Sequence, residues 1–132
     1  MNALQSKART GFIYDVEVVR NGVVIDRETV HNLIPDEGVK HMQEVIFKGA
    51  TQVTTWYLSI FEGNYTPVAG LTAAAYPAAA TECTAYTAGT RLEWSEGAVV
   101  GGSLDNSAAK AEFTMNADKT IYGGVLTSGA AH

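Results

Sequence analysis

Four carboxylates occur close together near the start of the chain, at Asp15, Glu17, Asp26 and Glu28. A pair of carboxyl groups placed around a glycosidic bond can carry out acid–base hydrolysis. If residues 11–30 form a regular hairpin, several of these carboxylates share its polar face. We favour a simpler interpretation, in which they line a solvated sheet face with Arg20 and Arg27 as cross-strand partners.

The other potentially reactive side chains form no known motif. His31, His41 and His132 lack the spacing of a zinc site. Cys83 is the only cysteine, so it cannot form a disulfide within the chain. We expect it to be a small, partly buried side chain, with a nucleophile or an intermolecular link as the alternatives. P-loop, GxSxG, GxGxxG and HExxH motifs are absent, so the sequence predicts a protein that is not an enzyme and uses no metal or cofactor.

Aromatic side chains suggest a second kind of site, a sugar-binding platform. The residues that could build it are Trp56, Tyr57, Tyr65, Tyr76, Tyr86 and Trp94. Most of them occupy strand positions, where packing in the core is the expected role. A carbohydrate-binding module is therefore kept as an alternative function.

Composition limits the class of protein. The 132 residues are enough for one domain, and 46% hydrophobic with 17% charged residues excludes wholesale disorder. A net charge of −5 without a Lys/Arg cluster argues against nucleic-acid binding. The sequence contains no run of about 18 apolar residues, so it predicts no membrane-spanning helix. The first residues also lack the apolar segment of a signal peptide, so we expect synthesis in a reducing cytoplasm.

Two regions are expected within the chain. Residues 1–10 are polar and predict a flexible N-terminal arm, and residues 11–132 predict a single β-rich domain. Asn21-Gly22 separates two β-type runs, which is the strongest short signal for a hairpin over 11–30. Apolar residues alternate along its first strand and predict a half-buried face made of Phe12, Tyr14, Val16 and Val18.

One amphipathic helix and one buried strand follow the hairpin. Helical spacing of apolar residues predicts a helix over about 35–48, with Pro35 at the first helical position and Gly49 as its C-cap. Residues 53–62 carry apolar side chains on both faces, which is typical of a central strand.

The rest of the chain predicts loops and short strands. Residues 65–80 are rich in Ala, Thr and Pro and are too weakly patterned for a core element. Residues 82–94 predict a strand interrupted at Gly89, and 109–127 predict a second hairpin. Six or seven short strands with one helix indicate a mainly β fold, either a β-sandwich or jelly-roll-like arrangement or a barrel.

Four stretches of the sequence resemble a family of small structural proteins of tailed bacteriophages. These stretches are residues 31–38 (HNLIPDEG), 54–67 (TTWYLSIFEGNYTP), 80–86 (ATECTAY) and 120–126 (TIYGGVL). Together they extend over about residues 31–128 and contain no catalytic motif. The resemblance implies a component of the virion.

Within that class, the resemblance favours a capsid cement, or decoration, protein on the outer surface of the shell. Its expected partners are the major capsid protein and further copies of the chain, as a dimer or trimer. Loops and termini often carry such contacts, so residues 1–10 and 65–80 are the expected contact segments. The contact residues selected from them are Lys7, Arg9, Tyr65, Pro67, Leu71 and Tyr76. A head–tail adaptor or tail component, and a carbohydrate-binding module on a host-facing part, are the alternatives.

Overall fold

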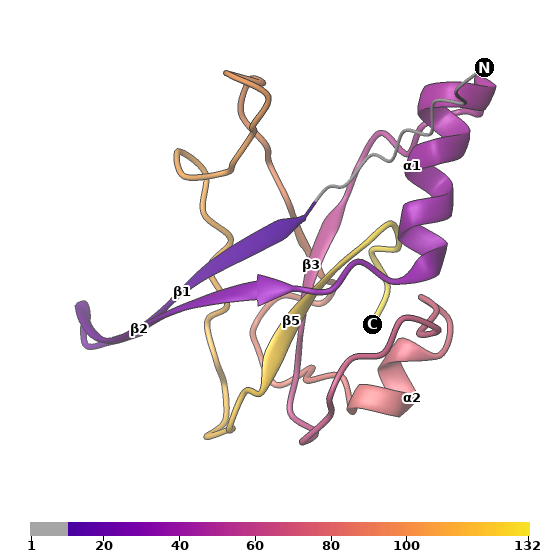
Figure 1. Ribbon diagram of the computed structural model, residues 1–132. Helices are drawn as coiled ribbons and strands as arrows, with labels where there is room; N and C mark the ends of the chain where they lie inside the picture. The colour runs from indigo at the N-terminus through magenta and orange to yellow at the C-terminus, as the bar shows by residue number, and fades with distance from the viewer. Residues whose placement is uncertain (1–10) are drawn as a thin grey trace, which may run out of the picture.

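The computed structural model describes residues 11–132, which form a mainly β fold as the sequence predicted (Figure 1). The arm expected at residues 1–10 lies outside the described residues. Five strands and two helices occur in the described part, fewer strands than expected. In chain order they are β1 (Phe12–Arg20), β2 (Val23–Asn32), α1 (Asp36–Lys48), β3 (Tyr57–Phe61), α2 (Tyr76–Ala80), β4 (Leu92–Glu93) and β5 (Gly123–Thr127).

β1 and β2 form the predicted antiparallel hairpin. Asn21 and Gly22 have φ angles of 52° and 75°, the left-handed conformation that a two-residue hairpin turn requires. The register shifts after Val18, because Val18 pairs with Asp26 while the next residue of β1 pairs with Val24. One residue of β2 is therefore extra and forms a bulge.

The three-stranded sheet has the order β4-β3-β5, and both neighbours are antiparallel to β3. The prediction that residues 53–62 contain a central strand is confirmed. The predicted second hairpin over 109–127 is wrong, because β5 pairs with β3 instead. Gly123 allows this pairing, since a Cβ at that position would lie 2.5 Å from the Phe61 ring. Residues 114–116 run beside 85–87, where Thr87 N–H donates to Thr114 O at 2.9 Å.

α1 confirms the predicted amphipathic helix with a small correction at its start. Pro35 is not the first helical residue but precedes the helix, with an extended backbone (φ −60°, ψ 158°). Gly49 ends the helix in the left-handed conformation, at φ 67°. No residue of α1 is fully buried, so the helix covers the sheet only loosely. Within residues 11–132, no helix has the length and apolar character needed to cross a membrane.

The core lies between β3, β5 and the segment from 65 to 80. Phe61, Leu71, Tyr76 and Ala80 are buried there, and Tyr65 packs against them. The prediction that this segment is too weakly patterned for the core is therefore wrong. The small side chains of its Ala residues let α2 lie close to the sheet. Gly63 N–H, next to β3, donates to the carbonyl of Ala80 at 3.0 Å.

The hairpin and the three-stranded sheet are both open sheets. They meet at the base of the hairpin, where the Phe12 and Trp94 rings contact edge to face with centroids 6.4 Å apart. Burial of Tyr14 in the same region raises the pKa of its hydroxyl. The turn at the other end of the hairpin projects away from the rest of the structure (Figure 1).

Candidate functional site

Two of the predicted contact residues belong to the core. Leu71 is only 9% exposed and Tyr76 only 1%, so neither can contact a partner in the folded chain. The expectation that they do so is corrected. The sequence misled because an Ala-rich segment has no clear periodicity, while the neighbouring strand β3 supplies the apolar surface that buries both side chains.

The remaining predicted contact residues are either half-buried or outside the described part of the chain. Tyr65 and Pro67 are half-buried, and Tyr65 packs edge to face against Phe61 with ring centroids 6.4 Å apart. Lys7 and Arg9 lie outside the described residues. The four of these residues that the structure describes do not form one exposed surface.

Within residues 11–132, the β1–β2 hairpin exposes large apolar side chains on both of its faces. Nearly every residue of β2 is exposed, as is the half of β1 nearest the turn except for half-buried Glu17. Several of these side chains are large and apolar, and each is 39–61% exposed: Ile13, Val16, Val18, Val19, Val23, Val24, Ile25 and Val30. A two-stranded hairpin is marginally stable alone, and an apolar patch that is not covered marks a binding surface.

The bulge in β2 decides which charges meet across the hairpin. A regular hairpin would pair Glu17 with Asp26, two like charges. The shifted register pairs Glu17 with Arg27, whose guanidinium lies 3.1 Å from the Glu17 carboxylate. Asp15 accepts a hydrogen bond from the Thr29 hydroxyl at 2.6 Å in the same way. Cross-strand pairing, rather than a hydrolytic carboxylate pair, therefore explains these two acids.

The same shift moves the other two carboxylates to the opposite face. Opposed residues of an antiparallel pair point to one side, so Asp26 lies beside Val18 and Glu28 beside Val16. We call these four residues the Val16 face. Among the described residues, neither carboxylate forms an ion pair. The four carboxylates therefore divide two and two between the faces, because the bulge breaks the regular pairing on which a shared polar face depends.

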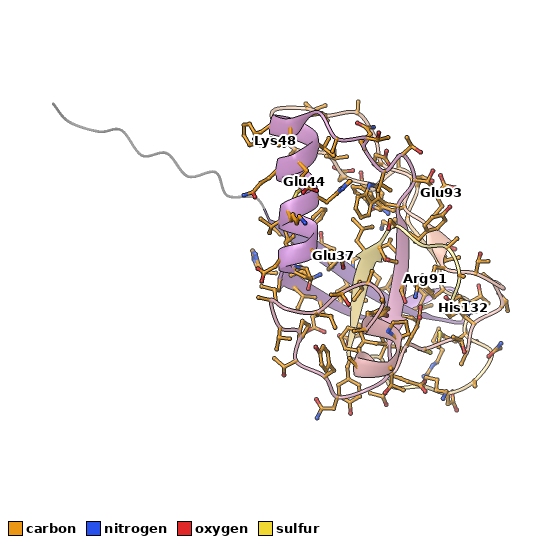
Figure 2. All side chains as sticks on the ribbon, turned by 90° about the vertical axis from the view of Figure 1, so that its right-hand side faces the viewer. Glu37, Glu44, Lys48, Arg91, Glu93 and His132 are labelled. Atoms are coloured by element: carbon orange, nitrogen blue, oxygen red, sulfur yellow. The ribbon has the colours of Figure 1, made fainter. Side chains whose placement is uncertain are left out.

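A buried ion pair joins Glu82 to Arg91. Figure 2 shows Arg91 across the three-stranded sheet from α1. Two guanidinium nitrogens donate to the two carboxylate oxygens at 2.7 and 2.8 Å, and a third donates to the Gly129 carbonyl at 2.9 Å. The Ser59 hydroxyl donates to the same carboxylate at 2.5 Å. Burial pushes the pKa of Glu82 upward, but the hydrogen bonds from Arg91 and Ser59 outweigh burial and hold it below its usual range.

These groups form one hydrogen-bonded network in the core. All three guanidinium nitrogens of Arg91 donate within the chain, both Glu82 oxygens accept, and the Tyr76 hydroxyl extends the network 2.7 Å from Ser59 Oγ. Cys83 is fully buried, and burial raises the pKa of its thiol, which disfavours the reactive thiolate. Within residues 11–132, no group of three or more His, Cys, Asp and Glu side chains is placed to hold a metal ion.

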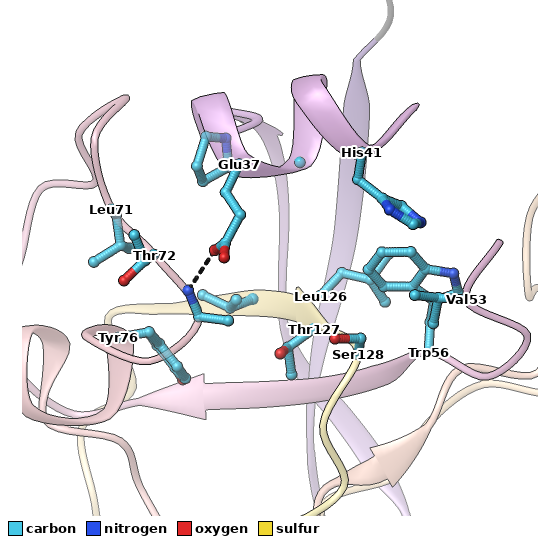
Figure 3. A pocket seen from close by; sticks show the side chains of 14 residues that line it. Glu37, His41, Val53, Trp56, Leu71, Thr72, Tyr76, Leu126, Thr127 and Ser128 are labelled. Atoms are coloured by element: carbon cyan, nitrogen blue, oxygen red, sulfur yellow. Dashed lines mark hydrogen bonds between the residues drawn. The ribbon is translucent and has the colours of Figure 1, made fainter. Parts of the chain in front are cut away.

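A cavity of about 230 Å³ lies between the start of α1, β5 and the segment that precedes α2 (Figure 3). Its charged group, the Glu37 carboxylate, already accepts a hydrogen bond from the Ala73 N–H at 2.7 Å. The His41 ring packs edge to face against Trp56, with centroids 6.0 Å apart. Ligand pockets are usually larger, about 300–1,000 Å³. The cavity is therefore a packing space under a loosely seated helix.

Comparison of the chain with protein-family models, curated proteins and solved structures found no significant match. The site must therefore be judged on its own geometry. Within residues 11–132, the hairpin is the candidate surface, because its apolar side chains stay exposed in the folded chain.

Sequence reasoning missed this surface because it placed Val16 and Val18 on a half-buried face. The alternation was read correctly, and its first half, Phe12 and Tyr14, does pack against the body. The face then continues beyond the edge of the three-stranded sheet. Nothing in the sequence reports where that edge lies, although two carboxylates in the facing strand are a signal that the distal half is not enclosed.

Proposed function

We propose that this chain is a non-enzymatic structural protein of a tailed-bacteriophage virion, and specifically a capsid cement protein. The observation that supports this role is the β1–β2 hairpin, which carries apolar side chains outward with no cover from the described part of the chain. A protein that bridges subunits needs such a surface and a rigid body behind it. The buried Glu82–Arg91 network supports the rigid body.

In this proposal the partner is the major capsid protein, contacted on the outer surface of the shell after synthesis in the bacterial cytoplasm. A shell offers many equivalent sites, so modest affinity at each site is sufficient for a stable lattice. A dimer or trimer of the chain at a symmetric position of the shell belongs to the same proposal. The net charge of −5 is consistent with a position outside the DNA-filled interior.

The sandwich, jelly-roll-like or barrel arrangement predicted from the sequence is also part of the proposal. The hairpin is one open two-stranded layer. A β-sandwich needs a second layer on its apolar face. In the assembled shell, the surface of the partner would supply that layer.

One alternative loses support from the geometry. A sugar platform needs exposed aromatic rings, whereas Tyr76 and Tyr86 are only 1% and 3% exposed. Tyr86 instead packs edge to face on Phe113, with centroids 5.1 Å apart. A head–tail adaptor or tail component uses the same kind of surface as a cement protein and differs from it in copy number.

Copy number therefore tests the proposal. Quantitative mass spectrometry of purified particles of the phage that encodes the chain gives its ratio to the major capsid protein. We expect a ratio of one, or a simple fraction of one, because a cement protein follows the symmetry of the shell. A few copies per particle would assign the chain to the portal or tail, and absence from the particle would refute a virion role.

A further inference from the structure

We propose that the Val16 face of the hairpin is the docking surface, and that it binds an apolar patch of the capsid protein flanked by Lys or Arg side chains. This inference rests on the proposed function and adds to it the face and the chemistry of the partner. It starts from the two faces of the hairpin, which differ in charge although both expose apolar side chains.

The face opposite to the Val16 face has its charges compensated within the chain. Glu17 lies between Arg27 at 3.1 Å and the Lys110 ammonium at 3.5 Å. Asp15 is hydrogen-bonded to Thr29. A partner would gain little from these groups, because each already has a local partner.

The acids of the Val16 face have no cationic partner among residues 11–132, and Asp26 accepts only a backbone hydrogen bond, from the Arg27 N–H at 2.9 Å. Val16 and Val18 form an apolar row on β1, 47% and 44% exposed, and the two acids beside them form a row on β2. Arg20 continues the β1 row toward the turn, yet it forms no ion pair with either acid among the described residues. An apolar row next to an acidic row is complementary to an apolar patch next to cationic side chains.

The Val16 face is also favoured because it continues a row of side chains that is already packed against the body. The row begins at the base of the hairpin with Phe12 and Tyr14, which already pack against the body of the protein. Val16 and Val18 extend the same row past the body. A partner that sits beside the body at this point would continue an existing packed layer.

A second copy of the chain is a poor occupant of the same face. Stacking two Val16 faces would bring four carboxylates, two copies each of Asp26 and Glu28, together with only two copies of Arg20, so the contact would be net negative. The whole chain carries a net charge of −5, which adds to the repulsion. The charge pattern thus selects a cationic partner over self-association.

The test measures binding of the purified chain to empty shells of the encoding phage that lack it. Glu28→Lys reverses one charge on the Val16 face, and Glu44→Lys makes the same change on α1, which lies far from the hairpin turn (Figure 1). We expect Glu28→Lys to raise the Kd by about tenfold or more, because like charges would then face each other across the interface. Glu44→Lys should stay within about twofold, the effect of a remote charge screened beyond about 10 Å at 0.1 M salt.

Val18→Ser tests the apolar row in the same assay, and thermal unfolding of each variant checks that it folds. A loss of binding in both hairpin variants supports the proposal.

Equal binding by wild type, Glu28→Lys and Val18→Ser would overturn it while leaving the cement role intact. A wild-type chain that sediments as a dimer, and becomes monomeric with Val18→Ser without losing shell binding, would overturn it in favour of a second copy. Failure of the wild type to bind shells would refute the proposed function itself.

Discussion

Replacing Arg91 by Met should destabilise this protein severely, because it leaves a buried carboxylate without its cation. The Arg91 and Glu82 side chains are only 7% and 4% exposed. Two direct hydrogen bonds between them disappear in the variant, as does the one to the Gly129 carbonyl. The Ser59 hydroxyl remains as a donor to Glu82, but it brings no positive charge.

The expected loss is about 3–5 kcal/mol of unfolding free energy, the usual cost of removing one partner of a buried pair. Domains of this size are stable by only about 5–15 kcal/mol in total. At roughly 4 °C per kcal/mol, the melting temperature should fall by about 12–20 °C. Arg27→Met is the matched control, since Arg27 is 71% exposed and its pair with Glu17 should contribute less than about 1 kcal/mol.

The pH dependence separates a charge effect from a simple packing loss. In the wild type, the pKa of Glu82 lies below its usual range, so the pair stabilises the fold fully above the usual carboxyl pKa of about 4.3. That stabilisation disappears as the pH falls through the lowered pKa. In Arg91→Met, burial without a cation raises the pKa of Glu82, so protonation removes the penalty as the pH falls.

Urea unfolding at pH 7 and at pH 4 should therefore show a difference between wild type and Arg91→Met that shrinks at the lower pH. A difference that is equally large at both values would mean that lost packing, not the uncompensated carboxylate, destabilises the variant. A loss below about 1 kcal/mol at pH 7 would contradict the burial argument altogether.

Three further predictions follow from the packing. Gly123→Ala should cost about 1–3 kcal/mol in urea unfolding, because its Cβ would lie 2.5 Å from the Phe61 ring, whereas Gly70→Ala, with open space around it, should be nearly neutral. A thiol reagent should label Cys83 only at the rate of unfolding, since the side chain is fully buried, and fast labelling of the native protein would show that the site opens. Val18→Ser should change the unfolding free energy by less than about 0.5 kcal/mol, as at other exposed positions, and a larger loss would place Val18 in the core.

The elements that sequence analysis predicted well are those with local signals. Asn21-Gly22 specifies the hairpin turn because both positions need a positive φ, and the structure confirms it. Gly49 ends α1 for the same reason. The conformation of such a turn or cap depends on residues that are adjacent in sequence. It can therefore be predicted without knowing the rest of the fold.

Contacts between segments far apart in the chain could not be predicted from such local signals. The sequence predicts a second hairpin over 109–127, in which segments close in the chain pair with each other. The structure instead places β5 against β3, where Gly123 leaves room for the Phe61 ring. Glu82 and Arg91 carry no signal of their own, because an acid and a base nine residues apart are usually a solvated pair.

The hairpin surface shows most clearly which features the sequence determines and which depend on the tertiary structure. Sequence alone established the hairpin, its turn and the alternation that makes Val16 and Val18 neighbours on one face. Only the tertiary structure decided that a bulge shifts the register, that Asp26 and Glu28 therefore lie beside these valines, and that the body ends before it covers them. The physical reason is that side-chain direction alternates with local backbone geometry, whereas register and burial depend on packing between segments far apart in the chain.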